Sequence, residues 1–303
     1  MVYIPEQFAR STVEIFAEKG KQWLNELPLL LEDCATRWSL KIQDPFPNLT
    51  YNYVIPVLCT NGTEAVLKLG VPCLEFSHEA HALRQYDGKG IVRPLACDTE
   101  KGAMLLEKLT PGQSLASITD EEHATSLIGQ VMKQLWKQEP KQHSFPAISN
   151  WAKGLERMRI YFEGGTGPFP KQLVEKAESL FPQLIASISS PLLLHGDLHH
   201  DNVLSANREP WLAIDPKGVI GEAEYETVAY LRNHLLNHPN PKAILRQRID
   251  QLSSELQLDR ERMLSWGLCH CILSSWWSIE DHGYGWENTI NIANMFDELL
   301  KKK

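Results

Sequence analysis

The residues HGDLHHDN place several side chains that can bind protons or metal ions directly after an apolar run. Asp197 stands in this stretch, and Asn202 follows it five residues later. A second apolar run, 211–214, ends at Asp215, so the two runs predict paired strands joined by a turn. That pairing would bring Asp197, Asn202 and Asp215 together. Mg²⁺ prefers carboxylate and amide oxygens, often only one or two of them from protein. These residues therefore predict a magnesium site.

Two other interpretations compete with this one. A single Asp or Asn in a loop is usually a turn former or a helix cap, but three at this spacing favour a site. The histidines His195, His199 and His200 suggest zinc, yet the chain holds no HExxH motif, and His78-Glu79-Ala80-His81 misses it by one residue. Zinc would also leave Asp215 without a role. Magnesium is the favoured prediction.

The first third of the chain predicts the elements that flank such a site. Residues 6–33 have the apolar spacing of a helix, and residues 76–86 predict a second helix. Asn61-Gly62 between two apolar runs predicts a hairpin. Five runs read as strands: RWSLKI, YNYVIPVLCT, TEAVLKLG, GIVRPLAC and AMLLEKL. The pattern predicts a five-stranded sheet with one helix inserted after the third strand.

The rest of the chain is mostly helical in pattern. Residues 109–115 predict a crossover, and the following helix has a good N-cap in Thr119 or Asp120. Helices are predicted over residues 120–138, 148–162, 171–188, 225–236 and 241–256, with two more before the end. We therefore predict an α+β chain with a small mixed lobe at 1–108 and a larger, mostly helical lobe at 109–303.

Composition limits the classes of function. A net charge of −8 disfavours a nucleic-acid surface, which needs a basic stripe. It permits a cationic small substrate, although mild acidity is common in soluble proteins. No apolar run approaches the roughly 20 residues of a membrane span, and the first residues lack a secretory signal pattern. Six cysteines without a CxxC pair indicate reduced thiols, so we expect a cytoplasmic protein with no membrane or nucleic-acid partner.

The motifs also resemble those of a known family. HGDLHHDNVL is similar to the catalytic loop HxDxxxxN of protein kinases and aminoglycoside phosphotransferase-like kinases, and IDPKG resembles their metal-binding motif. The run IDPKGVIGEAEYETVAYLRN resembles the resistance kinases that modify streptomycin-type aminoglycosides and hydroxyurea. YNYVIP and GTEAVLKL resemble strands of the same kinases, and the resemblance extends from about Trp23 to Trp286.

The resemblance implies a bilobal protein kinase-like fold, ATP and Mg²⁺ as cofactors, and transfer of the γ-phosphate to a hydroxyl of a small molecule. Asp197 would orient the hydroxyl or accept its proton, and Asn202 and Asp215 would hold the metal. Lys68 would grip the α- and β-phosphates while Glu79 pairs with it. Backbone groups near Glu107 to Leu109 would meet the adenine. Ile55, Val66, Leu105 and Ile214 are apolar candidates for its pocket, with plain core packing as an equal alternative.

Departures from the protein kinases favour a small-molecule acceptor. No GxGxxG loop is present, and residues 44–50 stand in its place. Gly196 replaces the arginine of the protein kinase loop, and Pro216-Lys217 replaces Phe-Gly. The chain also lacks an activation segment with an APE-like end. A protein kinase-like enzyme acting on a peptide or metabolite is the less favoured alternative.

The acceptor itself is the weakest part of the prediction. A cationic, streptomycin-like compound is expected, with a housekeeping metabolite or a hydroxyurea-like compound as alternatives. A pseudokinase is disfavoured because the catalytic residue types are all present. Acidic side chains that either bind the cation or merely face solvent are Glu222, Glu224, Glu280, Asp281 and Glu287. Aromatic side chains that either line a pocket or pack the last helices are Trp276, Trp277, Tyr284 and Trp286. The sequence does not determine the oligomeric state.

Overall fold

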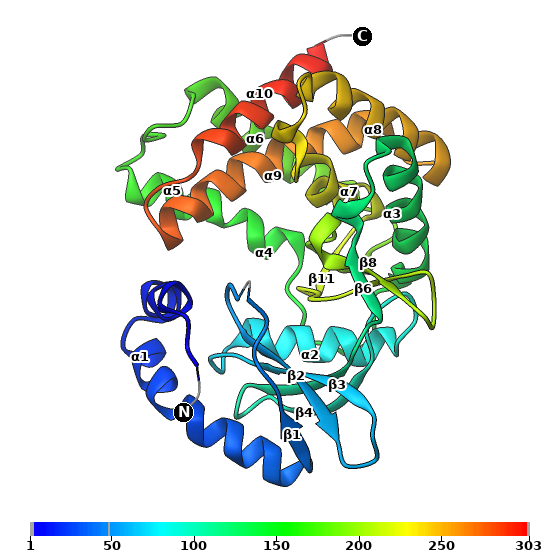
Figure 1. The fold of residues 1–303 in the computed structure, drawn as a ribbon. Helices are drawn as coiled ribbons and strands as arrows, with labels where there is room; N and C mark the ends of the chain where they lie inside the picture. The colour runs from blue at the N-terminus through cyan, green and yellow to red at the C-terminus, as the bar shows by residue number, and fades with distance from the viewer. Residues whose placement is uncertain (1–2, 48, 302–303) are drawn as a thin grey trace. The chain divides into compact units, whose positions relative to one another are not determined.

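A computed structural model of the chain describes residues 3–47 and 49–301. The chain folds into two compact units (Figure 1). The first comprises Met1–Gly112 with Ala206–Arg208, and the second comprises Gln113–Ser205 with Glu209–Lys303. Among the described residues, no helix is both long enough and apolar enough to cross a membrane.

The first unit is built on one antiparallel sheet. The five strands lie in the order β1-β2-β3-β5-β4, and every neighbouring pair is antiparallel. The elements are α1 (Glu6–Arg37), β1 (Leu40–Ile42), β2 (Tyr53–Cys59), β3 (Glu64–Leu69), α2 (Leu74–Tyr86), β4 (Pro94–Asp98) and β5 (Ala103–Glu107). The predicted five-stranded sheet with a helix inserted after the third strand is confirmed.

The core of the first unit lies between α1 and one face of this sheet. In β2, alternate residues Tyr53, Ile55 and Val57 are buried, which is the period of a strand with one covered face. The side chains of α1 that join them recur at helical spacing, Trp23, Leu27, Leu31 and Cys34. The helix is interrupted at Ala17, where φ is 48°. Ile55 and Leu105 belong to this core, so for these two the core-packing alternative holds.

The hairpin between β2 and β3 forms where the sequence predicts it. Gly62 has a φ of +83°, which an L-residue adopts only with strain. The backbone N–H of Thr63 donates to Asn61 Oδ1 at 3.0 Å, and Cys59 and Thr63 are joined by a backbone hydrogen bond of 2.9 Å. This turn sets the register of β3 against β2, and the register places Lys68 opposite Val54.

The second unit is mainly helical with two small sheets. The sheets have three strands each, in the orders β10-β9-β6 and β11-β8-β7. Their strands are β6 (Pro111–Ser114), β7 (Lys137–Gln138), β8 (Leu192–Leu194), β9 (Val203–Ala206), β10 (Trp211–Ala213) and β11 (Val219–Gly221). The 3-10 turns are η1 (Leu115–Ser117), η2 (His200–Asn202) and η3 (Leu235–Asn237).

The helices of this unit pack around a nearly buried α9. Figure 1 shows α9 in orange with α10 in red beside it, and α5, α6, α7 and α8 also contact α9. Asp120 Oδ1 accepts the His123 N–H at 3.0 Å, so Asp120 is the N-cap of α3. The helices are α3 (Glu121–Leu135), α4 (Ile148–Ala152), α5 (Gly154–Tyr161), α6 (Lys171–Ala186), α7 (Ala223–Arg232), α8 (Pro241–Leu256), α9 (Arg260–Asp281) and α10 (Glu287–Lys301).

Two sequence predictions for this unit were wrong. The run 192–194 does not pair with 211–214: β8 pairs with β11 and β7, and β10 pairs with β9. The short turn at 207–210 closes β9 onto β10 because residues 203–206 are themselves extended and lie immediately before it. The predicted helix 148–162 is two helices, α4 and α5. Gly154 begins the second one, and a side chain there would lie 2.5 Å from Leu273 of α9.

Candidate active site

Lys68 and Glu79 form a buried ion pair in the first unit. Lys68 lies in the middle of β3, and its Nζ atom is 2.6 Å from Glu79 Oε1 on α2. The two residues are only 2% and 7% exposed. Removing charges from water is costly, so a buried ammonium is stable chiefly beside an opposite charge. The pair therefore holds one positive charge at a fixed point of the sheet.

In the second unit, Asp197 lies in a tight loop that starts at the end of β8. Gly196 has a φ of +83°, and a side chain there would lie 2.9 Å from Val219 and 3.1 Å from the ring of Trp151. Glycine is needed on both counts. The side chain of Asp197 is 30% exposed. The loop thus presents a carboxylate at the surface of the unit on a backbone that packing confines.

Asn202 and Asp215 lie on neighbouring segments of this unit. Asn202 Nδ2 donates to the carbonyl of Asp197 at 2.9 Å, which leaves Oδ1 as the amide atom for a cation. The Ile214 N–H donates to the Asn202 carbonyl at 2.9 Å, so Asp215 follows directly from a residue bound to Asn202. Asp215 has a φ of 59°, an uncommon conformation for a residue with a side chain. Asp197, Asn202 and Asp215 are thus brought into one small region.

The oxygen atoms of Asn202 and Asp215 suit a magnesium site better than a site in which every metal ligand comes from the protein. Among the residues that the structure describes, no group of three or more His, Cys, Asp or Glu side chains could hold a metal ion. A carboxylate and an amide oxygen are a small ligand set, and Mg²⁺ commonly completes such a set with water and phosphate oxygens. Asn202 and Asp215 therefore fit the cofactor that the sequence predicts.

His195 ties the two motifs of the second unit together. Its Nε2 atom lies 2.7 Å from the Ile214 carbonyl, and its own carbonyl accepts the Lys217 N–H at 2.7 Å. The ring is wholly buried, and that burial lowers the pKa of His195 to about 4, despite the nearby carbonyl and carboxylates. The ring is therefore neutral at neutral pH and positions the segment that carries Asp215 against the segment that carries Asp197.

Glu226 is a residue of this site that the sequence analysis missed. It lies on α7 and is 2% exposed, yet its two carboxylate oxygens accept the backbone N–H groups of His195 at 2.6 Å and Gly196 at 2.9 Å. Burial raises the pKa of Glu226 to about 7, although the two backbone donors lower it. Its neighbours Tyr225 and Thr227 are buried as well, but nothing in the local sequence marks Glu226 as a partner of the loop that carries Asp197. Glu226 holds the backbone immediately before Asp197.

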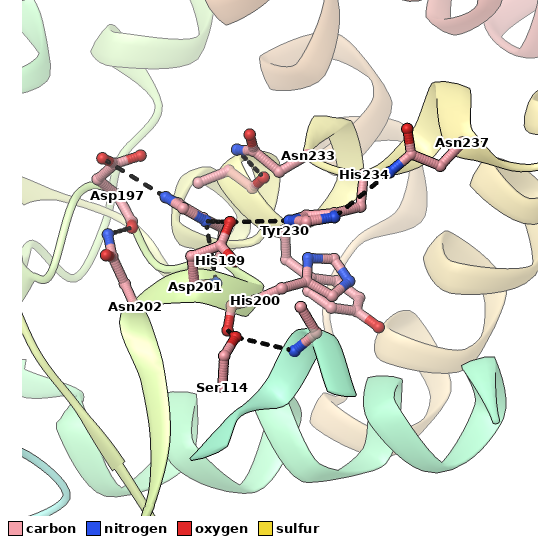
Figure 2. A network of polar contacts seen from close by, with 12 residues as sticks. Ser114, Asp197, His199, His200, Asp201, Asn202, Tyr230, Asn233, His234 and Asn237 are labelled. Carbon is pink, nitrogen blue, oxygen red and sulfur yellow. Dashed lines mark hydrogen bonds and ion pairs between the residues drawn. The ribbon is translucent and has the colours of Figure 1, made fainter. Parts of the chain in front are cut away.

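A chain of polar contacts reaches Asp197 from the other side (Figure 2). His199 Nε2 lies 3.9 Å from Asp197 Oδ2, and His199 Nδ1 accepts the Asp201 N–H at 3.3 Å. His234 Nε2 lies 2.8 Å from Asp201 Oδ2. Burial lowers the pKa of His199, against the influence of Asp197 and Asp201. The third histidine of the loop, His200, is buried and stacks on the Tyr230 ring at 4.4 Å.

Glu107 takes part in contacts inside the first unit. Its N–H donates to the Arg93 carbonyl at 2.9 Å, and its carboxylate accepts Arg208 Nη2 at 2.6 Å. Its side chain and backbone donor are thus both engaged in holding the unit together. Leu109 follows β5, just before the cis Thr110-Pro111 bond. Of the segment 44–50, the Phe46 N–H donates to Val54, whereas Asn48 lies outside the described residues.

Three of the acidic residues considered for a cationic substrate have structural partners. Glu222 is 7% exposed, accepts Arg262 Nη2 at 2.7 Å and also bonds the Trp266 indole N–H. Glu280 pairs with Arg157 at 2.6 Å, and Glu224 accepts the Asp259 N–H at 3.2 Å. Glu222 is therefore not a solvent-facing acid, because Arg262 on α9 pairs with it, a contact that the sequence does not reveal.

The aromatic residues near the end of the chain do not form one set. Trp276 is 3% exposed and lies 5.4 Å from the ring of Tyr161. Trp286 makes an edge contact with Phe169 at 5.5 Å, and Tyr284 is exposed. Trp277 is partly exposed and lies 5.7 Å from Trp151, the ring beside Gly196. Only Trp277 of the four is linked in this way to the loop that carries Asp197.

Comparison with known proteins places these motifs in a family. Residues 37–282 match the profile of the aminoglycoside/hydroxyurea antibiotic resistance kinases. A streptomycin 6-kinase of Streptomyces glaucescens is 33% identical over 285 residues, which are 93% of this chain and 92% of that protein. A hydroxyurea phosphotransferase of Kitasatospora aureofaciens is 30% identical over 93% of this chain and 82% of its own length.

Solved structures confirm the kind of fold. An aminoglycoside phosphotransferase, crystallised with ADP and hygromycin B, superimposes with a TM-score of 0.64 at 12% identity. The match covers 89% of this chain and 97% of that protein. At this identity the likeness shows the fold alone, and the fold is the predicted protein kinase-like one, with a five-stranded antiparallel sheet followed by a mainly helical part.

Proposed function

Because this chain belongs to the aminoglycoside/hydroxyurea antibiotic resistance kinases and is a small-molecule phosphotransferase that uses ATP, we propose that its acceptor is a hydroxyl of a streptomycin-type aminoglycoside. The observation that carries this proposal is the 33% identity to a streptomycin 6-kinase over nearly the whole of both chains. The geometry around Asp197 supports it, since a confined loop with a partly exposed carboxylate suits the positioning of a hydroxyl group.

In this proposal Asp197 orients the acceptor hydroxyl and takes its proton. A base of this kind must come within about 2.6–3.2 Å of the hydroxyl oxygen when the substrate binds. Glu226 and His195 position the loop through its backbone. Glu226 accepts the N–H groups of His195 and Gly196, and His195 Nδ1 accepts the Asp197 N–H at 3.3 Å. Phosphoryl transfer needs mainly alignment and charge stabilisation, so a rigid loop is the protein's principal contribution.

Asn202 and Asp215 would hold Mg²⁺, which supplies positive charge to the phosphate oxygens of the nucleotide when it is bound. Lys68 supplies a second positive charge, and Glu79 keeps its ammonium at a fixed point of β3. The nucleotide's adenine is proposed to meet backbone groups near Glu107 to Leu109. Because the side chain and the N–H of Glu107 are already bonded within the first unit, we propose that the adenine meets the backbone carbonyl of Glu107 and the backbone of Leu109. A two-lobed assignment, with nucleotide binding in the first unit, belongs to the same proposal.

The proposed substrate is cationic, and exposed acids are the proposed contacts. We take Asp281 and Glu287 as the first candidates because both are exposed, whereas Glu222 is buried against Arg262. Attraction between exposed charges is screened over about 8 Å at physiological salt. Turnover of a cationic acceptor at low concentration should therefore fall as salt rises.

A second candidate acceptor is hydroxyurea, which is neutral. The 30% identity to a hydroxyurea phosphotransferase over 93% of this chain favours it. Its hydroxyl could use Asp197 in the same way, but its binding would not depend on acidic side chains. Salt dependence of turnover therefore separates the two candidates.

The test is phosphorylation of a panel at two salt concentrations. The panel contains streptomycin, hydroxyurea and a neutral sugar, with MgATP and the purified chain. We expect transfer to streptomycin with a KM that rises with salt. Transfer to hydroxyurea alone, without salt dependence, would select the second candidate. Absence of transfer to every compound would overturn the proposed acceptor class. Asp197→Asn is the control for catalysis by this site.

We also propose that the protein works in the cytoplasm, where ATP is available. All six cysteines are free thiols, three of them buried, which suits a reducing compartment.

A further inference from the structure

The polar chain that reaches Asp197 begins at the turn after α7. Asn237 Nδ2 lies 3.5 Å from His234 Nδ1, and His234 Nε2 lies 2.8 Å from Asp201 Oδ2. The Asp201 N–H donates to His199 Nδ1 at 3.3 Å, and His199 Nε2 lies 3.9 Å from Asp197 Oδ2. Figure 2 shows these side chains in sequence, with His199 between the two aspartates. These contacts join η3 to the loop that carries Asp197, through side chains and the backbone N–H of Asp201.

The donors and acceptors in this chain determine where each ring carries its proton. The Asp201 N–H can only donate, so His199 Nδ1 must be the nitrogen with the lone pair. A neutral His199 then carries its proton on Nε2, the atom that faces Asp197. By the same reasoning the ionised Asp201 carboxylate only accepts, so His234 Nε2 donates to it and His234 Nδ1 accepts from Asn237. Every hydrogen bond in the chain therefore points toward Asp197.

The same local arrangement occurs elsewhere without a catalytic group. His143 Nδ1 accepts the Phe145 N–H at 3.1 Å, and its Nε2 lies 3.0 Å from Glu139 Oε1. The chain thus uses the same local motif twice: Nδ1 of an imidazole accepts the N–H of the residue two positions ahead, and Nε2 faces a carboxylate. The motif at His199 differs in one respect, because the carboxylate that Nε2 faces is that of Asp197.

We propose that His199 is a positioning residue for Asp197. The Nε2–H group of His199 orients one carboxylate oxygen of Asp197 and leaves the other for the acceptor hydroxyl. The inference rests on the proposed function, in which Asp197 handles that hydroxyl. A separation of 3.9 Å is longer than a hydrogen bond. Catalytic hydrogen bonds are often long in the absence of substrate and shorten in the reacting complex. The Asp201 N–H fixes the His199 ring and its tautomer, and His234 in turn holds the Asp201 side chain.

The test compares two amide substitutions of the same ring. Asparagine places its amide near the ring's Nδ1 position, whereas glutamine reaches the Nε2 position and can donate to Asp197. We expect His199→Asn to lower kcat about 10- to 100-fold, the scale of a misplaced catalytic group, with KM for MgATP unchanged. His199→Gln should recover most of that loss. His143→Asn is the matched control and should keep wild-type kcat.

Melting temperature and kcat are measured on all variants with the acceptor that the panel identifies. Wild-type kcat in His199→Asn, or equal losses in the asparagine and glutamine variants, would overturn the proposal. If His199→Asn fails to fold, His234→Asn provides the second test, since it should lower kcat in the same direction by less. Wild-type kcat there would also overturn it. An active Asp197→Asn would instead defeat the proposed function, whereas an inactive Asp197→Asn with an unaffected His199→Asn defeats only this inference.

Discussion

Glu79 and Glu226 are both buried carboxylates that hold a functional group of their own unit, but they do so through different partners. Glu79 lies 2.6 Å from the ammonium of Lys68 and holds it by the attraction between opposite charges. Glu226 accepts two backbone N–H groups, those of His195 and Gly196, and touches no cation through them. The first arrangement fixes a charge, and the second fixes the path of the backbone.

This difference determines what each site tolerates. Removing one member of a buried ion pair leaves the other in a low-dielectric place, so the pair is sensitive to single substitutions and less so to joint replacement. A carboxylate that binds backbone groups has no partner side chain to replace, and its loss exposes two donors without their acceptor. The comparison therefore predicts distinct responses to mutation in the two units.

The largest expected effect tests what the backbone arrangement is for. Asp197→Asn keeps the volume of the side chain and the loop contacts of Glu226 but removes the carboxylate that we propose as the proton acceptor. We expect kcat to fall about 10²–10⁴-fold, while ADP affinity by calorimetry and the melting temperature stay at wild-type values. Turnover at the wild-type rate would mean that Glu226 holds a loop without a catalytic role.

The ion pair should respond next most strongly. Glu79→Gln should lower the free energy of unfolding by up to about 3–5 kcal/mol, the scale for breaking a buried pair, and should weaken MgATP binding. The double variant Lys68→Met/Glu79→Leu should regain stability but not MgATP affinity. Urea unfolding and calorimetry give the two quantities. A double variant no more stable than Glu79→Gln would contradict the ion-pair interpretation.

The third effect separates the two carboxylates by pH. The pKa of Glu226 in the folded state is about 7, above the ordinary 4.5, so folding takes up a proton between these values. The stability from this group is therefore present below about pH 4.5 and is lost as pH rises through about 7. The shift corresponds to roughly 3 kcal/mol at 1.4 kcal/mol per unit.

Glu226→Gln isolates this effect because the buried histidines titrate in both proteins. The difference in free energy of unfolding, wild type minus Glu226→Gln, should decrease as pH rises from 5 to 8. Glu224→Gln, two residues away and partly exposed, is the matched substitution on the same helix and is measured at the same pH values. A pH-independent difference for Glu226→Gln would show that this carboxyl ionises in the ordinary range.

The smallest effect concerns a third buried carboxylate, Glu222, whose partners are Arg262 and the Trp266 indole. Glu222→Gln should lower the free energy of unfolding by about 1.5–3 kcal/mol, the net value of hydrogen bonds to a charged group. KM for the acceptor should not change, because Arg262 and the Trp266 indole already engage the carboxylate. An increased KM for the cationic acceptor with unchanged stability would restore Glu222 as a substrate contact.

Local patterns were enough to predict much of the fold. The hairpin at Asn61-Gly62, the five strands and the bounds of α8 depend on turn residues, alternation and caps within a few residues of each other. The partners of β8 were predicted wrongly for the opposite reason. Which strand pairs with 192–194 depends on residues 137–138 and 219–221, and no local signal marks them as its neighbours.

The candidate residues divide in the same way. The sequence by itself determined which side chains are candidates for catalysis, because Lys68, Glu79, Asp197, Asn202 and Asp215 stand in recognisable motifs. Only the tertiary structure decided what holds the loop: Glu226 reaches His195 and Gly196 from a helix some 30 positions further along the chain. Glu222 and Glu226 are the same residue type, yet Glu222 pairs with an arginine whereas Glu226 accepts backbone N–H groups. A motif records chemistry within a segment, but the partner of a buried charge is set by packing between segments distant in sequence.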